Sequence, residues 1–313
     1  MINANVKKGG SFLQRLRKEM RTHPTLYLLM IPFVLYYILF DYVPMYGVTI
    51  AFQNYNVVKG IGGSDWVGLH HFKRFLNSYY FGRLVGNTLA ISLLSLIFSF
   101  PMPILLALSL NEVRSNPFRR TIQTLSYLPH FISTVVVCGI IRIFFDKDGI
   151  MTQVLTLFGM PNRNLLVYPQ YFRGIYIGTG IWQSMGWSSI IYIAALSGVS
   201  PELYEAATID GAGRFQKMWH VSIPAILPTI VTMFILNCGR LMSVGYEKIM
   251  LLYNENTYKT ADVISTYVYR YGLGGSFEYS YTTAISIFTS IVNVVLLTCS
   301  NFLSNKLSGY GLW

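Results

Sequence analysis

The sequence is short of charged residues and of cysteine, and both shortages narrow the class of protein. Only 12% of its 313 residues are charged, whereas 53% are hydrophobic; soluble domains are usually about a quarter charged. A chain this apolar would expose large sticky patches in water, so we expect lipid to be its solvent. Cys138, Cys238 and Cys299 lie far apart within apolar runs, which is neither a disulfide framework nor a metal-ligand pattern. We interpret them as packing residues.

The full sequence also lacks the motifs of enzymes and of nucleotide-binding proteins. It contains no Gly-x-x-x-x-Gly-Lys-Ser/Thr phosphate loop, so we expect no ATP site of that kind in this chain. The histidines show no ligand spacing, and no Ser/His/Asp or paired-carboxylate arrangement fits one membrane pocket. We therefore predict no catalytic residue, no metal and no cofactor in this chain.

Six apolar stretches are present, and each approaches the roughly 20 residues needed to cross the hydrocarbon layer. Backbone groups in lipid must satisfy one another, so we expect helices at these positions. Prolines should kink the second stretch and mark the start of the fifth. The sequence thus predicts an all-α membrane protein with about six transmembrane helices, at Leu26–Phe40, Gly86–Leu110, Leu125–Phe145, Gly174–Val199, Ile223–Gly245 and Tyr281–Leu303.

The first 24 residues form a basic arm ahead of the first apolar stretch. The arm resembles a secretion signal, but no small-x-small cleavage site follows, so we expect an uncleaved first span. Residues 11–22 are compatible with an interfacial amphipathic helix or with a disordered basic arm. We predict two parts, the arm at 1–24 and a membrane domain at 25–313.

Basic residues set the expected orientation. The surplus of 24 basic over 13 acidic residues is assigned here to membrane topology rather than to nucleic acid, for which we predict no role. The arm, residues 111–120, residues 198–222 and the tail are richer in Lys and Arg for their length than the other three connections. Because such density marks the cytoplasmic side, we expect both termini there.

The connection at 198–224, called the elbow below, lies on the predicted cytoplasmic side between the fourth and fifth stretches. Ser200 can cap a helix that begins with Pro201. Gly211 and Gly213 should end that helix, and a second short helix over 214–221 should lead into the next span. The pattern predicts a helix-turn-helix.

Small and acidic residues together suggest that the elbow docks with a partner. Ala206 and Ala207 allow close approach, while Glu205 and Asp210 can meet basic side chains. The alternative is an ordinary connecting loop whose alanines are only good helix formers.

The residues Glu205-Ala-Ala-x-x-Asp210-Gly-Ala, followed by Ile223-Pro224, resemble the EAA loop of permease subunits of bacterial binding-protein-dependent ABC importers. The resemblance implies a coupling helix in a cleft of an ATPase, with Glu205 pairing to a basic residue and Gly211 supplying the turn. Val221 stands where the family often has isoleucine. The implied ATPase-coupling residues are Glu205, Ala206, Ala207, Asp210, Gly211, Ala212 and Phe215.

Further segments are similar to sugar permeases of the maltose-transporter type, namely Trp66-Val-Gly-Leu-x-x-Phe72, Asn87-Thr88-Leu89, Arg119–Pro129 and Ile191–Ala195. Three shorter segments resemble the LplB-like branch, which is associated with oligosaccharides derived from polysaccharides: Asp41–Gly47, Lys59–Ser64 and Leu312-Trp313.

The resemblance implies a type I ABC importer fold in the bacterial cytoplasmic (inner) membrane, crossed several times and surrounded by lipid. It also implies a second homologous permease subunit and two ATPase subunits that bind ATP and Mg. An extracytoplasmic solute-binding protein would deliver an oligosaccharide. ATPase closure would draw the two coupling helices together and open a cavity alternately to either side.

Polar and aromatic residues near the fourth and fifth spans are the candidates for the substrate path: Trp182, Gln183, Trp187, Asn237, Arg240, Tyr246 and Glu247. For any single aromatic residue, helix packing or an interfacial belt is the competing interpretation. A charge within a span is costly, so Arg240 should face a polar cavity. We hypothesise that it favours acidic sugars such as uronate oligomers.

Three alternatives stay open at this point. An ion-coupled secondary transporter would need carboxylates inside its spans, and the six stretches contain none. A membrane enzyme would need a catalytic constellation. A permease of the same family for a non-sugar solute, such as a peptide or polyamine, is opposed only by the shorter LplB-like segments.

Overall fold

The computed structural model describes residues 19–313, and these fall into two compact units, Met1–Gly68 and Leu69–Trp313. Residues 19–22 are helical. The rest of the predicted basic arm, and most of the predicted interfacial helix at 11–22, lie outside the described residues.

The first unit consists mainly of one continuous helical segment, Pro24–Phe52. No residue of its first 14-residue helix is buried within the chain, although the stretch is almost entirely apolar. Such a helix suits a lipid environment. In order, its parts are α2 (Pro24–Tyr37), η1 (Ile38–Tyr42), α3 (Val43–Met45) and η2 (Tyr46–Phe52).

A small hairpin follows this helix. Strands β1 (Gln53–Asn54) and β2 (Asp65–Trp66) pair antiparallel, with Gln53 opposite Trp66. Between them lies α4 (Gly60–Gly63). The Ser64 hydroxyl fixes the connection, because it accepts the Asn56 N–H at 3.0 Å and donates to the Gly60 carbonyl at 2.6 Å.

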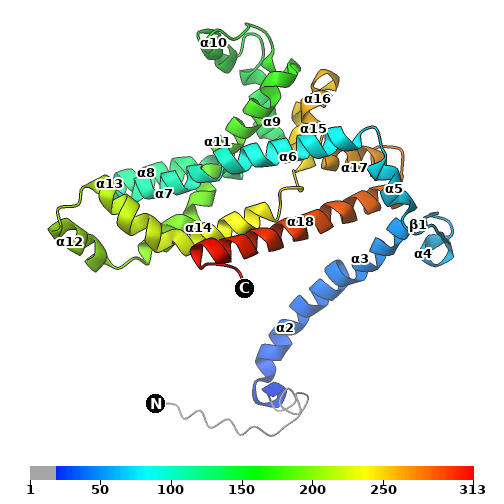
Figure 1. The fold of residues 1–313 in the computed structure, drawn as a ribbon, viewed down its shortest axis with the longest axis horizontal. Coiled ribbons are helices and arrows are strands. Elements are labelled where there is room, and N and C mark those ends of the chain that lie inside the picture. The colour runs from blue at the N-terminus through cyan, green and yellow to red at the C-terminus, as the bar shows by residue number, and fades with distance from the viewer. Residues whose placement is uncertain (1–18) are drawn as a thin grey trace. The chain divides into compact units, whose positions relative to one another are not determined.

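The second unit, Leu69–Trp313, is built of helices and the loops that connect them (Figure 1). Its long helix α11 packs against α7 and α14, while α18 packs against α14 and α17. The elements are α5 (His70–Leu76), α6 (Phe81–Phe98), α7 (Pro101–Asn111), α8 (Asn116–Tyr127), η3 (Leu128–Phe131), α9 (Thr134–Phe144), α10 (Ile150–Thr156), η4 (Leu165–Val167), α11 (Pro169–Ser197), α12 (Pro201–Ile209), α13 (Arg214–Lys217), η5 (Met218–Ser222), α14 (Ile223–Cys238), α15 (Tyr246–Leu252), η6 (Glu255–Thr257), α16 (Tyr258–Ala261), α17 (Ile264–Gly272) and α18 (Tyr279–Ser308).

Within residues 19–313, four helical segments are long and apolar enough to cross a membrane: Pro24–Phe52, Phe81–Asn111, Arg214–Cys238 and Tyr279–Ser308. A bent pair, Asn116–Phe131 with Thr134–Phe144, makes a fifth if it is one span. The predicted fourth span, Gly174–Val199, coincides with α11 up to Ser197, and this 29-residue helix is not among the four segments. The all-α membrane fold is thus present; four or five segments among the described residues qualify as crossings by length and composition, and the count of six stays a prediction.

The predicted single helix at Leu125–Phe145 is wrong in one respect, because the chain bends there by 100°. Ile132 and Ser133 take extended conformations, with ψ of 132° and 148°. The Ser133 hydroxyl then accepts the Val136 N–H at 3.4 Å and caps a new helix. Apolar composition suggested one span, whereas Pro129 and the cap divide it.

The fifth predicted span is shifted toward the N-terminus. The helix starts at Arg214 and runs without a break to Cys238, so the short helix predicted at 214–221 is its first part. Residues 239–245 leave the helix, and Arg240 lies in the turn after α14. Gly239 ends the helix, and a Cβ there would approach the Leu297 side chain to 2.6 Å.

Candidate functional site

The elbow folds locally as its sequence predicts. The Ser200 hydroxyl accepts the Glu202 N–H at 3.3 Å and caps α12. Gly211 has a φ of +79°, the left-handed conformation that glycine adopts without strain. The Ala212 N–H then donates to the Ala207 carbonyl at 2.9 Å, which closes the turn.

Two hydrogen bonds join the two arms of the elbow, and a third fixes the start of the second arm. The Tyr204 and Ser222 hydroxyls lie 2.9 Å apart and join α12 to η5. The Lys217 ammonium donates to the Thr208 hydroxyl at 2.7 Å. The Gly213 N–H donates to the Gln216 side chain at 2.7 Å. The elbow is therefore a fixed hook that continues directly into α14.

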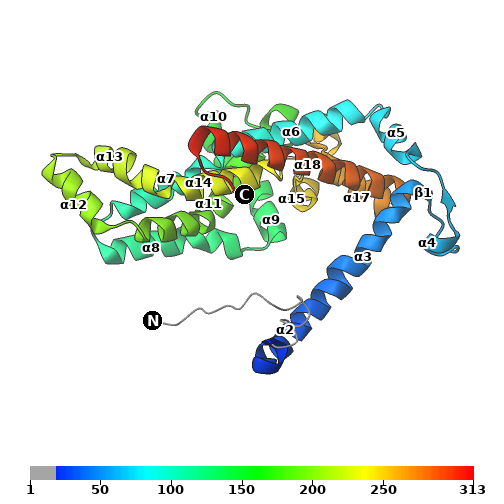
Figure 2. The ribbon, with the colours of Figure 1, turned by 60° about the horizontal axis from the view of Figure 1, so that its bottom comes forward.

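The outer side of the elbow is exposed, and its carboxylates have no ion-pair partner among residues 19–313. Ile209 is 87% and Phe215 83% exposed. Glu205 and Asp210 are exposed as well, and neither forms an ion pair within residues 19–313. In both views, α12 and α13 lie at the end of the second unit opposite α5 and α17 (Figures 1 and 2). Apolar surface flanked by free carboxylates suits a partner with an apolar groove and basic side chains.

A cavity of about 500 Å³ lies between α6, α7, α11, α14 and the turn at 239–245. Among residues 19–313, Arg240 is the one charged residue in its lining. Two tyrosines, Tyr176 and Tyr192, also line it. The lining is otherwise rich in hydroxyl groups, from Ser92, Ser95, Ser99, Ser184, Ser188 and Ser243.

Two of the predicted path residues line this cavity. Asn237 does so while its side-chain N–H donates to the Met233 carbonyl at 2.7 Å, which leaves its oxygen available. The Arg240 side chain is exposed and makes no ion pair with any residue from 19 to 313. The guanidinium is thus uncompensated within the described chain.

The other five predicted path residues lie outside the lining of this cavity. Trp187 stacks on His130, with ring centroids 4.7 Å apart, and Tyr246 stacks on Tyr269 at 5.0 Å. Trp182 is 44% exposed, Gln183 is partly buried, and Glu247 is exposed. A part for these residues in the substrate path stays a prediction.

Sequence reasoning missed the hydroxyl groups of the cavity. Ser92 and Ser95 lie three residues apart on α6, Ser99 follows four residues later as the residue after the helix, and Ser184 and Ser188 lie four apart on α11. This spacing places them on one face of each helix. A period of 3.6 in polar residues within an apolar stretch was the available signal.

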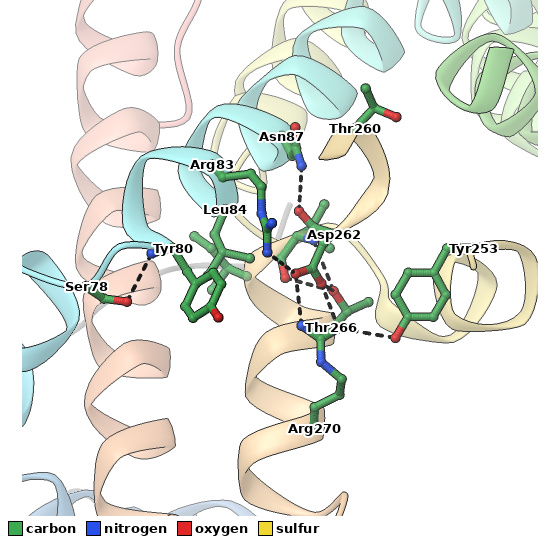
Figure 3. Close-up of polar contacts among 12 residues, drawn as sticks. Ser78, Tyr80, Arg83, Leu84, Asn87, Tyr253, Thr260, Asp262, Thr266 and Arg270 are labelled. Atoms are coloured by element: carbon green, nitrogen blue, oxygen red, sulfur yellow. Dashed lines mark hydrogen bonds and ion pairs between the residues drawn. The ribbon is translucent and has the colours of Figure 1, made fainter. Parts of the chain in front are cut away.

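The buried carboxylate of Asp262 connects α6 to α17, at the end of the second unit opposite the elbow (Figures 1 and 3). Its two oxygens accept hydrogen bonds from Arg270 at 2.7 and 2.9 Å, and from Thr266 at 2.8 Å. Arg83 approaches from α6 at 3.4 Å. Burial lowers the pKa of the Arg270 guanidinium, but its hydrogen bonds and the charge of Asp262 outweigh this and raise that pKa overall.

A second set of bonds extends this cluster to α11. The Asn87 side chain donates to the Asp262 backbone carbonyl at 2.9 Å (Figure 3). Arg173 donates in turn to the Asn87 side-chain oxygen at 2.8 Å and to the Thr260 carbonyl at 3.2 Å. We call Asp262, Arg83, Asn87, Arg173, Thr266 and Arg270 the Asp262 cluster.

The neighbouring Thr88 contributes to the same junction. Its hydroxyl accepts the Ile264 N–H at 3.1 Å, at the start of α17. Asn87-Thr88 therefore fastens the segment around Asp262 to α6, which gives a structural reason for the short motif noted in the sequence. Within residues 19–313, no group of three His, Cys, Asp or Glu side chains is placed to hold a metal ion.

Residues 99–309 match the family described as "Binding-protein-dependent transport system inner membrane component". The chain belongs to this family. It is therefore a transport permease of the inner membrane, and the resemblance inferred from the elbow is confirmed.

Relatives from Bacillus subtilis (strain 168) cover nearly the whole chain. The polygalacturonan/rhamnogalacturonan transport system permease protein YteP is 43% identical over 92% of this chain and 90% of its own length. Protein LplB is 40% identical over 98% and 95%.

A solved bacterial alginate ABC transporter, in complex with an alginate pentasaccharide-bound periplasmic protein, contains a similar chain. That chain is 40% identical, with a TM-score of 0.85 over 95% of this chain and all of that one. The type I ABC permease fold is thus confirmed.

Proposed function

We propose that this chain is the permease subunit of an ABC importer that moves oligosaccharides into the cytoplasm, driven by ATP hydrolysis on partner subunits. The observation that carries the proposal is the fixed geometry of the elbow, on which Phe215 and the carboxylates of Glu205 and Asp210 are exposed, and neither carboxylate has an ion-pair partner among residues 19–313. The partners are a second homologous permease, two ATPase subunits that bind ATP and Mg, and an extracytoplasmic solute-binding protein.

The elbow docks in a cleft of the ATPase through Glu205, Ala206, Ala207, Asp210, Gly211, Ala212 and Phe215. Motion passes inward along one element, because the helix Arg214–Cys238 is continuous from the elbow to the cavity wall. At 1.5 Å per residue, its 25 residues span about 37 Å. Displacement of the elbow therefore tilts the helix that carries Asn237, and Arg240 directly follows it.

The substrate is an oligosaccharide, and the charge at the cavity favours an acidic one. The hydroxyl groups of the cavity can exchange hydrogen bonds with sugar hydroxyls, and Arg240 supplies a lone positive charge. Two similar proteins are named for acidic polymers, polygalacturonan and alginate. Arabinooligosaccharide permeases are more distant, for example AraP of Bacillus subtilis (strain 168) at 30% identity.

The docking is tested by cross-linking. Ala206→Cys, in a background where the exposed Cys299 is replaced by Ser, should cross-link to the ATPase subunit in the assembled transporter. Leu157→Cys, 84% exposed just after α10, is the matched control and should not. Equal yields at both positions, or none from the elbow, would refute the proposal.

The preference for acidic sugar is tested with Arg240→Gln. Reconstituted transporter should lose about tenfold in transport of uronate oligomers, because one charge-assisted hydrogen bond is removed. Transport of neutral oligosaccharides should change less than threefold. An equal loss for both substrates would contradict the preference and leave the docking proposal intact.

A further inference from the structure

A second positive charge lies beside the cavity, on a residue outside the predicted path. Lys248 belongs to α15 and is partly buried. Its ammonium donates to the Tyr176 carbonyl at 3.3 Å and lies 5.1 Å from the centre of the Tyr176 ring. Tyr176 itself lines the cavity. The ammonium is thus one side chain away from the space where we place the substrate.

This ammonium has fewer partners than its chemistry calls for. An ammonium carries three N–H donors, and Lys248 uses one of them on a backbone carbonyl. It forms no ion pair within residues 19–313. A charge removed from water without a counter-charge is costly. Burial accordingly lowers the pKa of Lys248 to about 8, and the nearby Cys138 opposes that shift.

Lys248 and Arg240 are joined by one short segment. Arg240 stands at the beginning of the non-helical turn, and Lys248 follows its end in α15. Between them, Leu241, Ser243, Val244 and Gly245 line the cavity. This segment therefore places one cation, Arg240, in the lining of the cavity and a second, Lys248, beside it, and the described residues of the lining include no carboxylate to neutralise either one.

We propose that Lys248 is a second binding residue for acidic sugar, whose ammonium pairs with one carboxylate of a uronate oligomer while Arg240 pairs with another. The inference rests on the proposed function and deepens it, because two cations, one in the cavity lining and one beside it, suit a polymer that repeats its negative charge. Binding supplies the missing counter-charge. The Tyr176 ring, which already contacts the ammonium, lies beside the sugar.

The test is equilibrium binding of trigalacturonate to the purified, fully assembled transporter. Lys248→Met, which keeps the length of the side chain and removes its charge, should weaken binding about tenfold, the order expected for one charge-assisted hydrogen bond. Lys248→Arg, which keeps the charge, should stay within threefold of the unmodified protein. The methyl ester of trigalacturonate has the same length without charge, and its affinity should be the same for all three proteins.

Other outcomes overturn the inference. Unchanged trigalacturonate binding by Lys248→Met, or an equal loss for the acid and its ester, would leave Lys248 a packing residue. Absence of trigalacturonate binding by the unmodified transporter would also overturn it. The proposed function fails separately, when no oligosaccharide delivered by the binding protein stimulates ATP hydrolysis by the unmodified transporter.

Discussion

The two ends of the second unit use charged residues in opposite ways. At the elbow, Glu205 and Asp210 are exposed and have no ion-pair partner among residues 19–313. At the other end, Asp262 is fully buried and bonded to Arg270, Arg83 and Thr266. A carboxylate that is already paired holds the fold together, whereas an exposed unpaired one in a rigid hook is available to another protein.

The cavity between these ends shows a third arrangement. Arg240 and Lys248 are cations that lack a counter-charge within the described chain. Unlike the elbow carboxylates, Arg240 lines a cavity and Lys248 lies beside it, so an anionic solute suits them better than a protein partner. Charge compensation therefore distinguishes the buried anchor at Asp262 from the proposed docking site at the elbow and the proposed substrate site at the cavity.

The largest effect should follow from Asp262→Asn, which removes one partner of a buried ion pair. We expect the free energy of unfolding in detergent to fall by about 3–5 kcal/mol, because two or more guanidinium groups lose their counter-charge. Thermal unfolding of the purified protein measures this loss. Asp65→Asn is the matched control, because the Lys59–Asp65 pair is 3.8 Å long and exposed, and it should leave the midpoint unchanged. Similar small shifts for both variants would show that the Asp262 cluster is no anchor.

Glu205→Lys should leave stability unchanged and weaken ATPase binding, the opposite of what we expect for Asp262→Asn. The unfolding midpoint should not change, because the carboxylate contacts no charged group in the described chain. Affinity for the ATPase subunit should fall about a hundredfold, since the reversed charge faces a basic residue in the proposed docked state. Glu255→Lys, exposed in η6, is the control and should bind the ATPase normally. A stable Glu205→Lys variant with normal ATPase binding would break the comparison between the two ends.

The two ends also differ in how far the sequence reveals them. The elbow was predictable because Ser200, Pro201 and Gly211 act on their own neighbours, through a cap, a first-turn position and a left-handed turn. The Asp262 cluster was not, because it brings Arg83 and Asn87 to a residue more than 170 positions away. No local pattern encodes such a contact.

The membrane helices were predictable in kind and less so in their limits. Apolar length identified the stretches, but it treated 125–145 as one helix and extended the fifth span to residue 245. In both places, a local backbone feature overrides composition, the Ser133 cap in one and the Gly239 ending in the other. The cavity required tertiary contacts, because its walls come from α6, α11, α14 and the turn after α14.

The smallest effect concerns the shape of the elbow and uses two nearby glycines. Gly211→Ala should cost about 1 kcal/mol in the free energy of unfolding, because φ is +79° there and a side chain strains that conformation. The space around it is open, with no atom within 4 Å of an added Cβ, so strain is the one expected cause. Gly213→Ala is the control, since Gly213 has a φ of −70°, and it should change stability little.

If the hook must keep its shape to dock, Gly211→Ala should also weaken ATPase binding several-fold while Gly213→Ala does not. Equal behaviour of the two variants would mean that the exposed carboxylates act without the fixed geometry of the turn.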